Sequence, residues 1–198
     1  KKNMIAAADG NISYKYSENE ISITPSGKHK GFIREKDLCV ITLDNRVLRG
    51  TPSGERLMHL EVYRRVPNAR AIVHAHPPTA VAFTVAKPEL TFLPEKSLSE
   101  VILAVGAIPI AKYARPGTQT MGDVLKPYLP EHRVLILARH GALSWGEDLI
   151  EAYQGIERLE HSAMILKSAI ELGGLSELPN TEVQYLKSLR KKLGPKTL

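Results

Sequence analysis

Hydrophobic and polar positions alternate along the chain between strand-like and helix-like spacing. Short apolar or alternating runs, bounded by Gly, Pro, Asp or Asn, predict strands at 21–24, 38–43, 71–74, 108–111 and 134–138. Apolar residues that step by three and four between 149 and 170, before Gly173-Gly174, predict a long amphipathic helix. Shorter stripes predict helices after Ser53, a candidate N-cap, and at 121–129 and 183–193. Strands with intervening helices favour a mixed α/β layer architecture.

Length and composition exclude several classes of protein. The chain has 198 residues, 43% hydrophobic and 24% charged, which predicts a single globular domain over 1–198. No apolar run reaches the ~18 residues of a membrane span, and the first residues carry no signal peptide, so we expect a cytoplasmic protein without a membrane partner. The single cysteine, Cys39, excludes an all-thiolate zinc site.

The charge balance bears on the ligand. A formal net charge of +6 favours anionic ligands such as phosphorylated metabolites. The charges are scattered and 6% of residues are aromatic, which gives no stacking platform, so we expect no nucleic-acid partner.

Three histidines are candidate metal ligands. His74 and His76 stand two apart at the end of a predicted strand, so both rings would point to the same face, and Pro77-Pro78 ends the strand where a ligand can reach them. His140 follows the apolar strand at 134–138 and would complete a three-histidine site with one open position, which is typical of catalytic zinc. The alternative is a set of incidental surface or structural histidines.

Three segments of small and polar residues predict turns whose backbone N–H groups and hydroxyls can hold a phosphate. They are Gly10-Asn11-Ile12-Ser13, Thr24-Pro25-Ser26-Gly27 and Thr51-Pro52-Ser53-Gly54. Each alone is consistent with an ordinary turn, and none matches a Walker A or dinucleotide fingerprint. Glu55 follows the third segment, where it is either catalytic or a carboxylate that favours the helix dipole. His59, four residues later on the same predicted helix, is a minor alternative metal ligand.

Together these segments resemble the class II aldolase/adducin superfamily, and within it the L-fuculose-1-phosphate-type aldolases. The matching stretches follow the family's order: GNIS (10–13), TPSG (24–27), PSGE (52–55), HAHPP (74–78), YARPGT (113–118) and RHGAL (139–143). The resemblance implies one α/β domain with a central, mainly antiparallel sheet flanked by helices. It also implies a homotetramer with active sites at subunit interfaces. Family members usually carry a further helix before the first motif, which is absent or cut in this sequence.

The resemblance also implies site residues. The three zinc ligands are matched by His74, His76 and His140, and the catalytic carboxylate by Glu55. The turns that bind the substrate phosphate are matched by Asn11, Ser26, Gly27, Ser53 and Gly54. The fuculose aldolases take a tyrosine from the neighbouring subunit; Glu100 occupies that region here and is the candidate second acid/base, with an ordinary surface carboxylate before a helix at 101–105 as the alternative.

The implied function is a zinc-dependent aldolase that reversibly cleaves a ketose 1-phosphate into dihydroxyacetone phosphate and an aldehyde. Zinc would act as a Lewis acid and Glu55 would move the proton at carbon. One alternative is a sugar-phosphate dehydratase of the methylthioribulose-1-phosphate type, whose sequence is similar at 26–31. A second is a ribulose-5-phosphate 4-epimerase, which carries aspartate at the position of Glu55. A third is an adducin-like scaffold domain, which has lost the zinc ligands.

Overall fold

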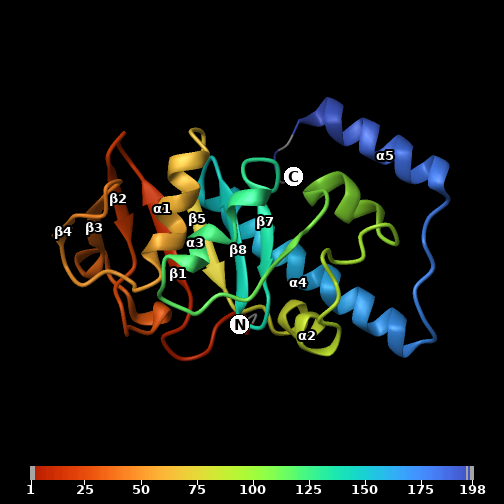
Figure 1. Ribbon diagram of the computed structural model, residues 1–198, viewed down its shortest axis with the longest axis horizontal. Coiled ribbons are helices and arrows are strands. Elements are labelled where there is room, and N and C mark those ends of the chain that lie inside the picture. The colour runs from red at the N-terminus through yellow and green to blue at the C-terminus, as the bar shows by residue number, and fades with distance from the viewer. Residues whose placement is uncertain (1–2, 195, 197–198) are drawn as a thin grey trace.

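The fold is built on one eight-stranded sheet with the strand order β4-β3-β2-β1-β5-β8-β7-β6 (Figure 1). The computed structural model describes residues 3–194 and residue 196. Strand pairs are antiparallel except β6 with β7, which is parallel. The strands are β1 Asn11–Lys15, β2 Glu20–Ile23, β3 Cys39–Thr42, β4 Val47–Arg49, β5 Ala71–Ala75, β6 Ile110–Ala111, β7 Val134–Leu137 and β8 Gly141–Gly146. The predicted mainly antiparallel sheet is confirmed.

Helices cover both faces of this sheet (Figure 1). The first face packs against α1 (Arg56–Arg65) and α3 (Thr120–Asp123), and the second against α2 (Pro78–Ala86) and α4 (Leu149–Glu171). Because both faces are covered, every residue of the central strand β5 is buried, and its sequence is a continuous apolar run up to the first histidine. Among the described residues, no helix has the length and apolar character that crossing a membrane requires.

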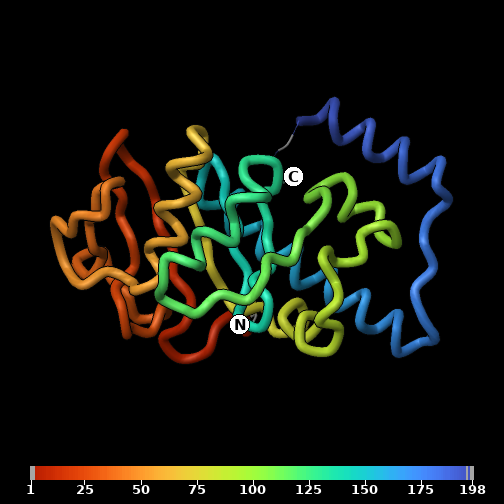
Figure 2. Tube along the Cα trace, viewed as in Figure 1, coloured from red at the N-terminus to blue at the C-terminus, as the bar shows by residue number. Residues whose placement is uncertain are grey.

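The last helix, α5 (Asn180–Leu193), lies away from the sheet. Its residues Val183 and Leu186 pack on the π-helix η3 (Val101–Val105), where they contact Ile102. Figure 2 shows the connection from α4 running along one end of the molecule before α5 turns back towards the sheet. The sheet and α1 to α4 therefore form the part of the fold that positions the candidate site.

Several predicted elements are confirmed with small shifts in their bounds. The strands predicted at 21–24, 38–43, 71–74 and 134–138 are β2, β3, β5 and β7, and the helices predicted at 149–170 and 183–193 are α4 and α5. The helix predicted at 121–129 is wrong as a single element: α3 ends at Asp123 and a separate 3-10 turn covers Lys126–Tyr128. Pro127 and Pro130 explain the break, because proline lacks the N–H that a continuous helix needs.

Two further predictions about local structure are wrong. The turn expected at 10–13 is instead the start of β1, because Gly10, at φ +70°, redirects the chain and Asn11 already pairs with His74 of β5. The N-cap of α1 is Glu55 rather than Ser53, whose Oγ accepts a hydrogen bond from the Glu55 N–H at 3.3 Å. The patterning also failed to predict β1, β8 and α2.

Candidate active site

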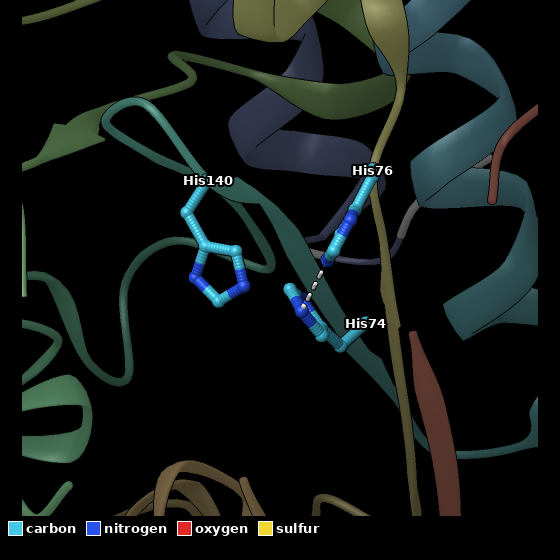
Figure 3. Close-up of side chains that lie close together, drawn as sticks. All are labelled: His74, His76 and His140. Atoms are coloured by element: carbon cyan, nitrogen blue, oxygen red, sulfur yellow. Dashed lines mark hydrogen bonds between the residues drawn. The ribbon is translucent and has the colours of Figure 1, made fainter. Parts of the chain in front are cut away.

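Three histidine side chains converge at one end of the central strands (Figure 3). His74 lies on β5, His76 follows directly after it, and His140 lies in the turn between β7 and β8. The Nε2 atoms of His74 and His76 are 3.2 Å apart, and one ring nitrogen of each of the three histidines lies within 4.8 Å of the others. The predicted convergence is confirmed, whereas the role of these residues as metal ligands stays a prediction.

Backbone features beside the histidines hold them close together. A Cβ added at Gly141 would lie 2.5 Å from the Ala75 carbonyl oxygen, 2.7 Å from His76 Cδ2 and 2.9 Å from His74 Cε1, so β8 can approach β5 here because residue 141 lacks a side chain. Arg139 adopts φ +60° and its N–H donates to Thr84 Oγ1 at 2.8 Å, which fixes the turn that carries His140.

Hydrogen bonds set the tautomers of two of the rings. His74 Nδ1 lies 2.8 Å from the Ala142 carbonyl oxygen, which can only accept, so Nδ1 carries a proton and Nε2 is the nitrogen that faces the other two rings. His76 Nδ1 lies 3.5 Å from the Asp9 carboxylate, which favours the same tautomer. Burial, and then the neighbouring His74 and His140, lower the pKa of His76 to about 4, so its ring is neutral near pH 7.

His74 Nε2 and His76 Nε2 face each other at 3.2 Å. A cation between them would bind one lone pair of each ring in its neutral form. Neutral imidazoles whose other nitrogen donates to a carbonyl or carboxylate are the usual form of metal-ligating histidine. The donor set of His74, His76 and His140 therefore fits a divalent metal of the zinc type.

Glu55 faces the same space from the start of α1. Its Oε1 lies 3.1 Å from His140 Nε2 and its Oε2 lies 3.3 Å from His74 Nε2. The Asn11 side-chain amide donates to Oε2 at 2.7 Å. Burial raises the pKa of Glu55, but hydrogen bonding to His140 and His74 lowers it by more, so the net pKa lies well below the usual carboxyl range. The carboxylate is therefore ionised and can bind a metal or take a proton.

Two of the predicted phosphate-binding turns lie side by side. Pro25 and Pro52 form an isolated β-bridge, the Ser26 N–H donates to the Thr51 carbonyl at 3.0 Å, and the Ser53 N–H donates to the Thr24 carbonyl at 3.2 Å. The residues Ser26, Gly27 and Gly54 are exposed, whereas Ser53 is buried. The structure thus brings these four predicted residues together on two paired turns, the second of which leads into Glu55.

Asn11 and His59 lie next to each other behind Glu55, and the phosphate-binding role of Asn11 stays a prediction. Asn11 is buried in β1, and its side-chain amide is bonded to Glu55 and His59. Both ring nitrogens of His59 are within hydrogen-bond distance of protein oxygens, on Asn11 and Ser13. His59 therefore does not belong to the histidine cluster, and the alternative that it is a metal ligand is wrong.

Glu100 lies apart from the cluster. It is exposed just before η3, and its Oε2 accepts a hydrogen bond from Ser99 Oγ at 2.8 Å. Within the described part of the chain, Glu100 makes no hydrogen bond or ion pair with Glu55 or the three histidines. A role for Glu100 at a metal site therefore requires a second copy of the chain.

Sequence reasoning missed two charged residues near the site. Asp9, which orients His76, stands directly before the GNIS segment, so its position next to a motif was an available signal. Lys30 donates from Nζ to the Ala8 carbonyl at 2.6 Å. Burial lowers the pKa of Lys30, while the nearby charges of Asp9 and Glu55 act in the opposite direction. Lys30 lies within the segment 26–31 that resembles the dehydratases, but that resemblance did not assign it to the site, because the long-range fold brings it there.

Comparisons with known proteins agree with this geometry. The family model of the class II aldolase and adducin N-terminal domain matches residues 1–166. The chain is 35% identical over 162 residues to L-fuculose phosphate aldolase of Methanococcus vannielii, covering 81% of this chain and 85% of that protein. A solved structure, L-fuculose-1-phosphate aldolase from Thermus thermophilus, superposes with a TM-score of 0.76 at 33% identity, covering 89% of this chain and 91% of that one.

Relatives with other names match almost as well. The chain is 30% identical to methylthioribulose-1-phosphate dehydratase of Methylococcus capsulatus, covering 79% of this chain and 81% of that protein. It is 28% identical to 3-oxo-tetronate 4-phosphate decarboxylase of Haemophilus influenzae, covering 90% of this chain and 86% of that protein. These names share a phosphorylated substrate and differ in the bond that is broken.

Proposed function

Because the chain belongs to the class II aldolase and adducin family, we propose that it is a zinc-dependent aldolase. It reversibly cleaves a ketose 1-phosphate resembling L-fuculose 1-phosphate into dihydroxyacetone phosphate and an aldehyde. The observation that carries the proposal is the convergence of three histidine side chains with a carboxylate, Glu55, which contacts two of them.

His74, His76 and His140 would hold the metal, which when bound supplies a Lewis acid for the negative charge that develops on the substrate oxygens. Glu55 takes the proton from C3 of dihydroxyacetone phosphate in the condensation direction and returns it to that carbon after cleavage. Its contacts with His74 and His140 place this carboxylate beside the proposed metal, where the proton would be accepted. Asn11 holds one carboxylate oxygen, which orients the other.

The paired turns supply the phosphate site of this proposal. Ser26, Gly27 and Gly54 are exposed and lie on adjacent turns, and the buried Ser53 accepts a hydrogen bond at Oγ from the Glu55 N–H. A phosphate held there keeps the reacting carbons close to Glu55, because Glu55 follows Gly54 directly in the chain. Since the Asn11 amide is bonded to Glu55, we assign Asn11 to the carboxylate rather than to the phosphate.

The dehydratase and the decarboxylase are the main competing activities, because relatives with those names are nearly as similar. In all three reactions negative charge develops beside a carbonyl, where a metal can stabilise it. The aldolase ranks first on the higher identity to an L-fuculose phosphate aldolase. The presence of Glu55, where the epimerases carry aspartate, counts against a 4-epimerase. The presence of all three histidines counts against an adducin-like scaffold.

A substrate panel tests the proposal. Purified, zinc-loaded protein is supplied with ketose 1-phosphates, ketose 5-phosphates, methylthioribulose 1-phosphate and a 3-oxo-tetronate 4-phosphate. The products are assayed as dihydroxyacetone phosphate, epimer, dehydrated sugar phosphate and carbon dioxide, with Glu55→Gln as the matched control. We expect dihydroxyacetone phosphate from at least one ketose 1-phosphate. Formation of one of the other products without any dihydroxyacetone phosphate would replace the aldolase by the corresponding activity.

We also propose a homotetramer in which Glu100 of one subunit reaches the metal site of the next. A cyclic assembly repeats one heterologous interface around an axis and can place the same residue at every site. The support within this chain is that Glu100 is exposed and separate from its own subunit's cluster.

A further inference from the structure

Behind Glu55, a line of buried polar side chains runs from the active site into the space between β1 and α1. Asn11 and Ser13 project from the same face of β1, two residues apart, and His59 and Tyr63 lie one turn apart on α1. These four residues are between 0% and 2% exposed. Their polar atoms must therefore be satisfied within the protein, because each unpaired one would be costly.

The hydrogen bonds in this line have one consistent direction. The Asn11 side-chain Nδ2 donates to Glu55 Oε2 at 2.7 Å. The other atom of the amide, Asn11 Oδ1, must then accept, and it lies 2.5 Å from Nε2 of His59. His59 thus carries its proton on Nε2.

The remaining bonds of the line follow from that tautomer. Burial lowers the pKa of His59 to about 3, so the ring is neutral and Nδ1 holds a lone pair. Nδ1 accepts from Ser13 Oγ at 2.7 Å, and Ser13 Oγ accepts from the Tyr63 hydroxyl at 2.8 Å. The donors therefore all point the same way along the line, from Tyr63 through Ser13, His59 and Asn11 to Glu55.

We propose that His59 is a positioning residue for Glu55: its Nε2–H fixes the Asn11 amide, which holds Oε2 of the carboxylate and leaves Oε1 to exchange a proton with substrate. The proposal rests on the proposed function, in which Glu55 moves that proton. Without a donor at His59, the Asn11 amide can turn over and present its oxygen to the carboxylate. Two acceptors would then face each other, and Glu55 would move out of position.

If His59 only filled space between β1 and α1, a histidine would not be needed there. An apolar residue would occupy the same volume without the cost of burying two ring nitrogens. His59 instead has both nitrogens paired and stands one helical turn after Glu55, so α1 supplies both the carboxylate and the group that orients it. The two side chains are thereby held in one rigid element, as precise placement of a reacting group requires.

The first test reads the tautomer directly. Nitrogen-15 NMR of the histidine rings, on the metal-free protein at pH 7, should show His59 as a neutral ring protonated on Nε2. The variant Asn11→Ala, which removes the acceptor, should shift that Nε2–H resonance. A ring protonated on Nδ1 would overturn the proposal. This readout needs neither metal nor substrate, so it is independent of whether the protein is an aldolase.

The second test uses two substitutions of similar size. His59→Gln can keep a donor near the Nε2 position, facing Asn11, whereas His59→Asn keeps a polar group near Nδ1, facing Ser13, and loses the donor to Asn11. Proton exchange at C3 of dihydroxyacetone phosphate should fall about 10–100-fold in kcat for His59→Asn, the range expected for a slightly misplaced catalytic group. KM and metal content should stay unchanged, and His59→Gln should recover most of the rate.

The outcomes separate the two proposals. Equal rates in His59→Asn, His59→Gln and the unmodified protein would overturn the positioning role while leaving the aldolase intact. If the unmodified protein exchanges no proton with any substrate of the panel, the proposed function fails, and the tautomer measurement alone decides the hydrogen-bond line. If His59→Asn does not fold, Asn11→Ala takes its place, since removal of the intermediate amide should lower kcat by a similar factor.

Discussion

Glu55 and Glu100 are the two carboxylates that the sequence singles out for proton transfer, and the fold places them in opposite settings. The Glu55 side chain is 17% exposed and contacts His74, His140 and Asn11. Glu100 is exposed, and its Oε2 accepts a hydrogen bond from its sequence neighbour Ser99. One chain therefore builds the candidate metal site and one oriented carboxylate by itself, whereas the proposed role of Glu100 at that site depends on assembly.

The largest effect on activity should come from removing one histidine of the cluster that Glu55 contacts. His74→Ala deletes a buried ring whose Nε2 lies 3.2 Å from that of His76. We expect the purified variant to have lost its divalent metal and all detectable aldol cleavage. Elemental analysis of both proteins, after identical purification, checks this. Unchanged metal content in the variant would mean that the histidine cluster is not the metal site.

Glu55→Gln should give the next largest effect. The amide keeps the size of the side chain but cannot accept the proton from carbon. We expect exchange at C3 of dihydroxyacetone phosphate to fall ~10²–10⁴-fold, as is typical for loss of a general base, with the metal retained. Isotope exchange followed by NMR measures the rate. Exchange close to that of the unmodified protein would remove Glu55 from the mechanism.

Glu100→Gln should have a smaller effect that depends on assembly. If Glu100 serves a neighbouring subunit, then mixing the Glu100→Gln protein with the Glu55→Gln protein should restore part of the activity. Some sites in the mixed tetramers would then hold both carboxylates intact. Activity after demonstrated subunit exchange, together with mass measurement in solution, tests this. No recovery would leave Glu100 as an ordinary surface carboxylate, and a monomer at working concentration would exclude the shared site altogether.

The smallest effect is on the pH dependence of stability, and it comes from His59, which is bonded through Asn11 to Glu55. Among the residues that the structure describes, Glu100 has no comparable buried partner. His59 has a folded-state pKa of about 3, whereas the unfolded chain titrates near ~6.5. Between these values the unfolded state binds a proton that the folded state does not, so the free energy of unfolding falls as pH falls. The loss from pH 7 to pH 5 is about 2 kcal/mol for one such group.

Urea denaturation of the metal-free protein at pH 7 and pH 5 measures this loss. The variant His59→Gln lacks the titrating ring, so its stability should depend less on pH than that of the unmodified protein. His161→Gln, which replaces an exposed histidine of α4, is the matched control for the loss of a histidine as such. Equal pH dependence in His59→Gln and the unmodified protein would contradict the prediction.

Sequence patterning predicted the strands and helices that have strong local signals. α4 was predictable because its apolar residues recur at helical spacing and Asp148 caps its first turn, accepting from the Glu151 N–H at 2.8 Å. The start of α2 was not, because its cap comes from far along the chain: the Glu160 carboxylate accepts from the Thr79 and Ala80 N–H groups. β8 was missed because a strand buried on both faces shows no alternation, and Gly141 and Gly146 at its ends suggest a loop.

The candidate site was predictable to a similar extent. The spacing of His74 and His76, and the place of Glu55 after a turn, identify them as candidates from the sequence. The distances between their side chains depend on how β1, β5 and β8 pair. The link from Glu55 through Asn11 to His59 could not be predicted, because Asn11 lies 44 and 48 residues away from these two partners. Spacing identifies which groups are available, and only tertiary packing shows which of them touch.

Gly141 gives these observations an evolutionary consequence. A side chain there would collide with His74, with His76 and with the backbone of β5. One added methyl group could therefore disturb the histidine cluster while all three histidines and Glu55 remain in the sequence. Descendants of this fold that have lost catalysis need not show it at their histidines. When genomes are searched for working members, the residue after the third histidine is as informative as the histidines themselves.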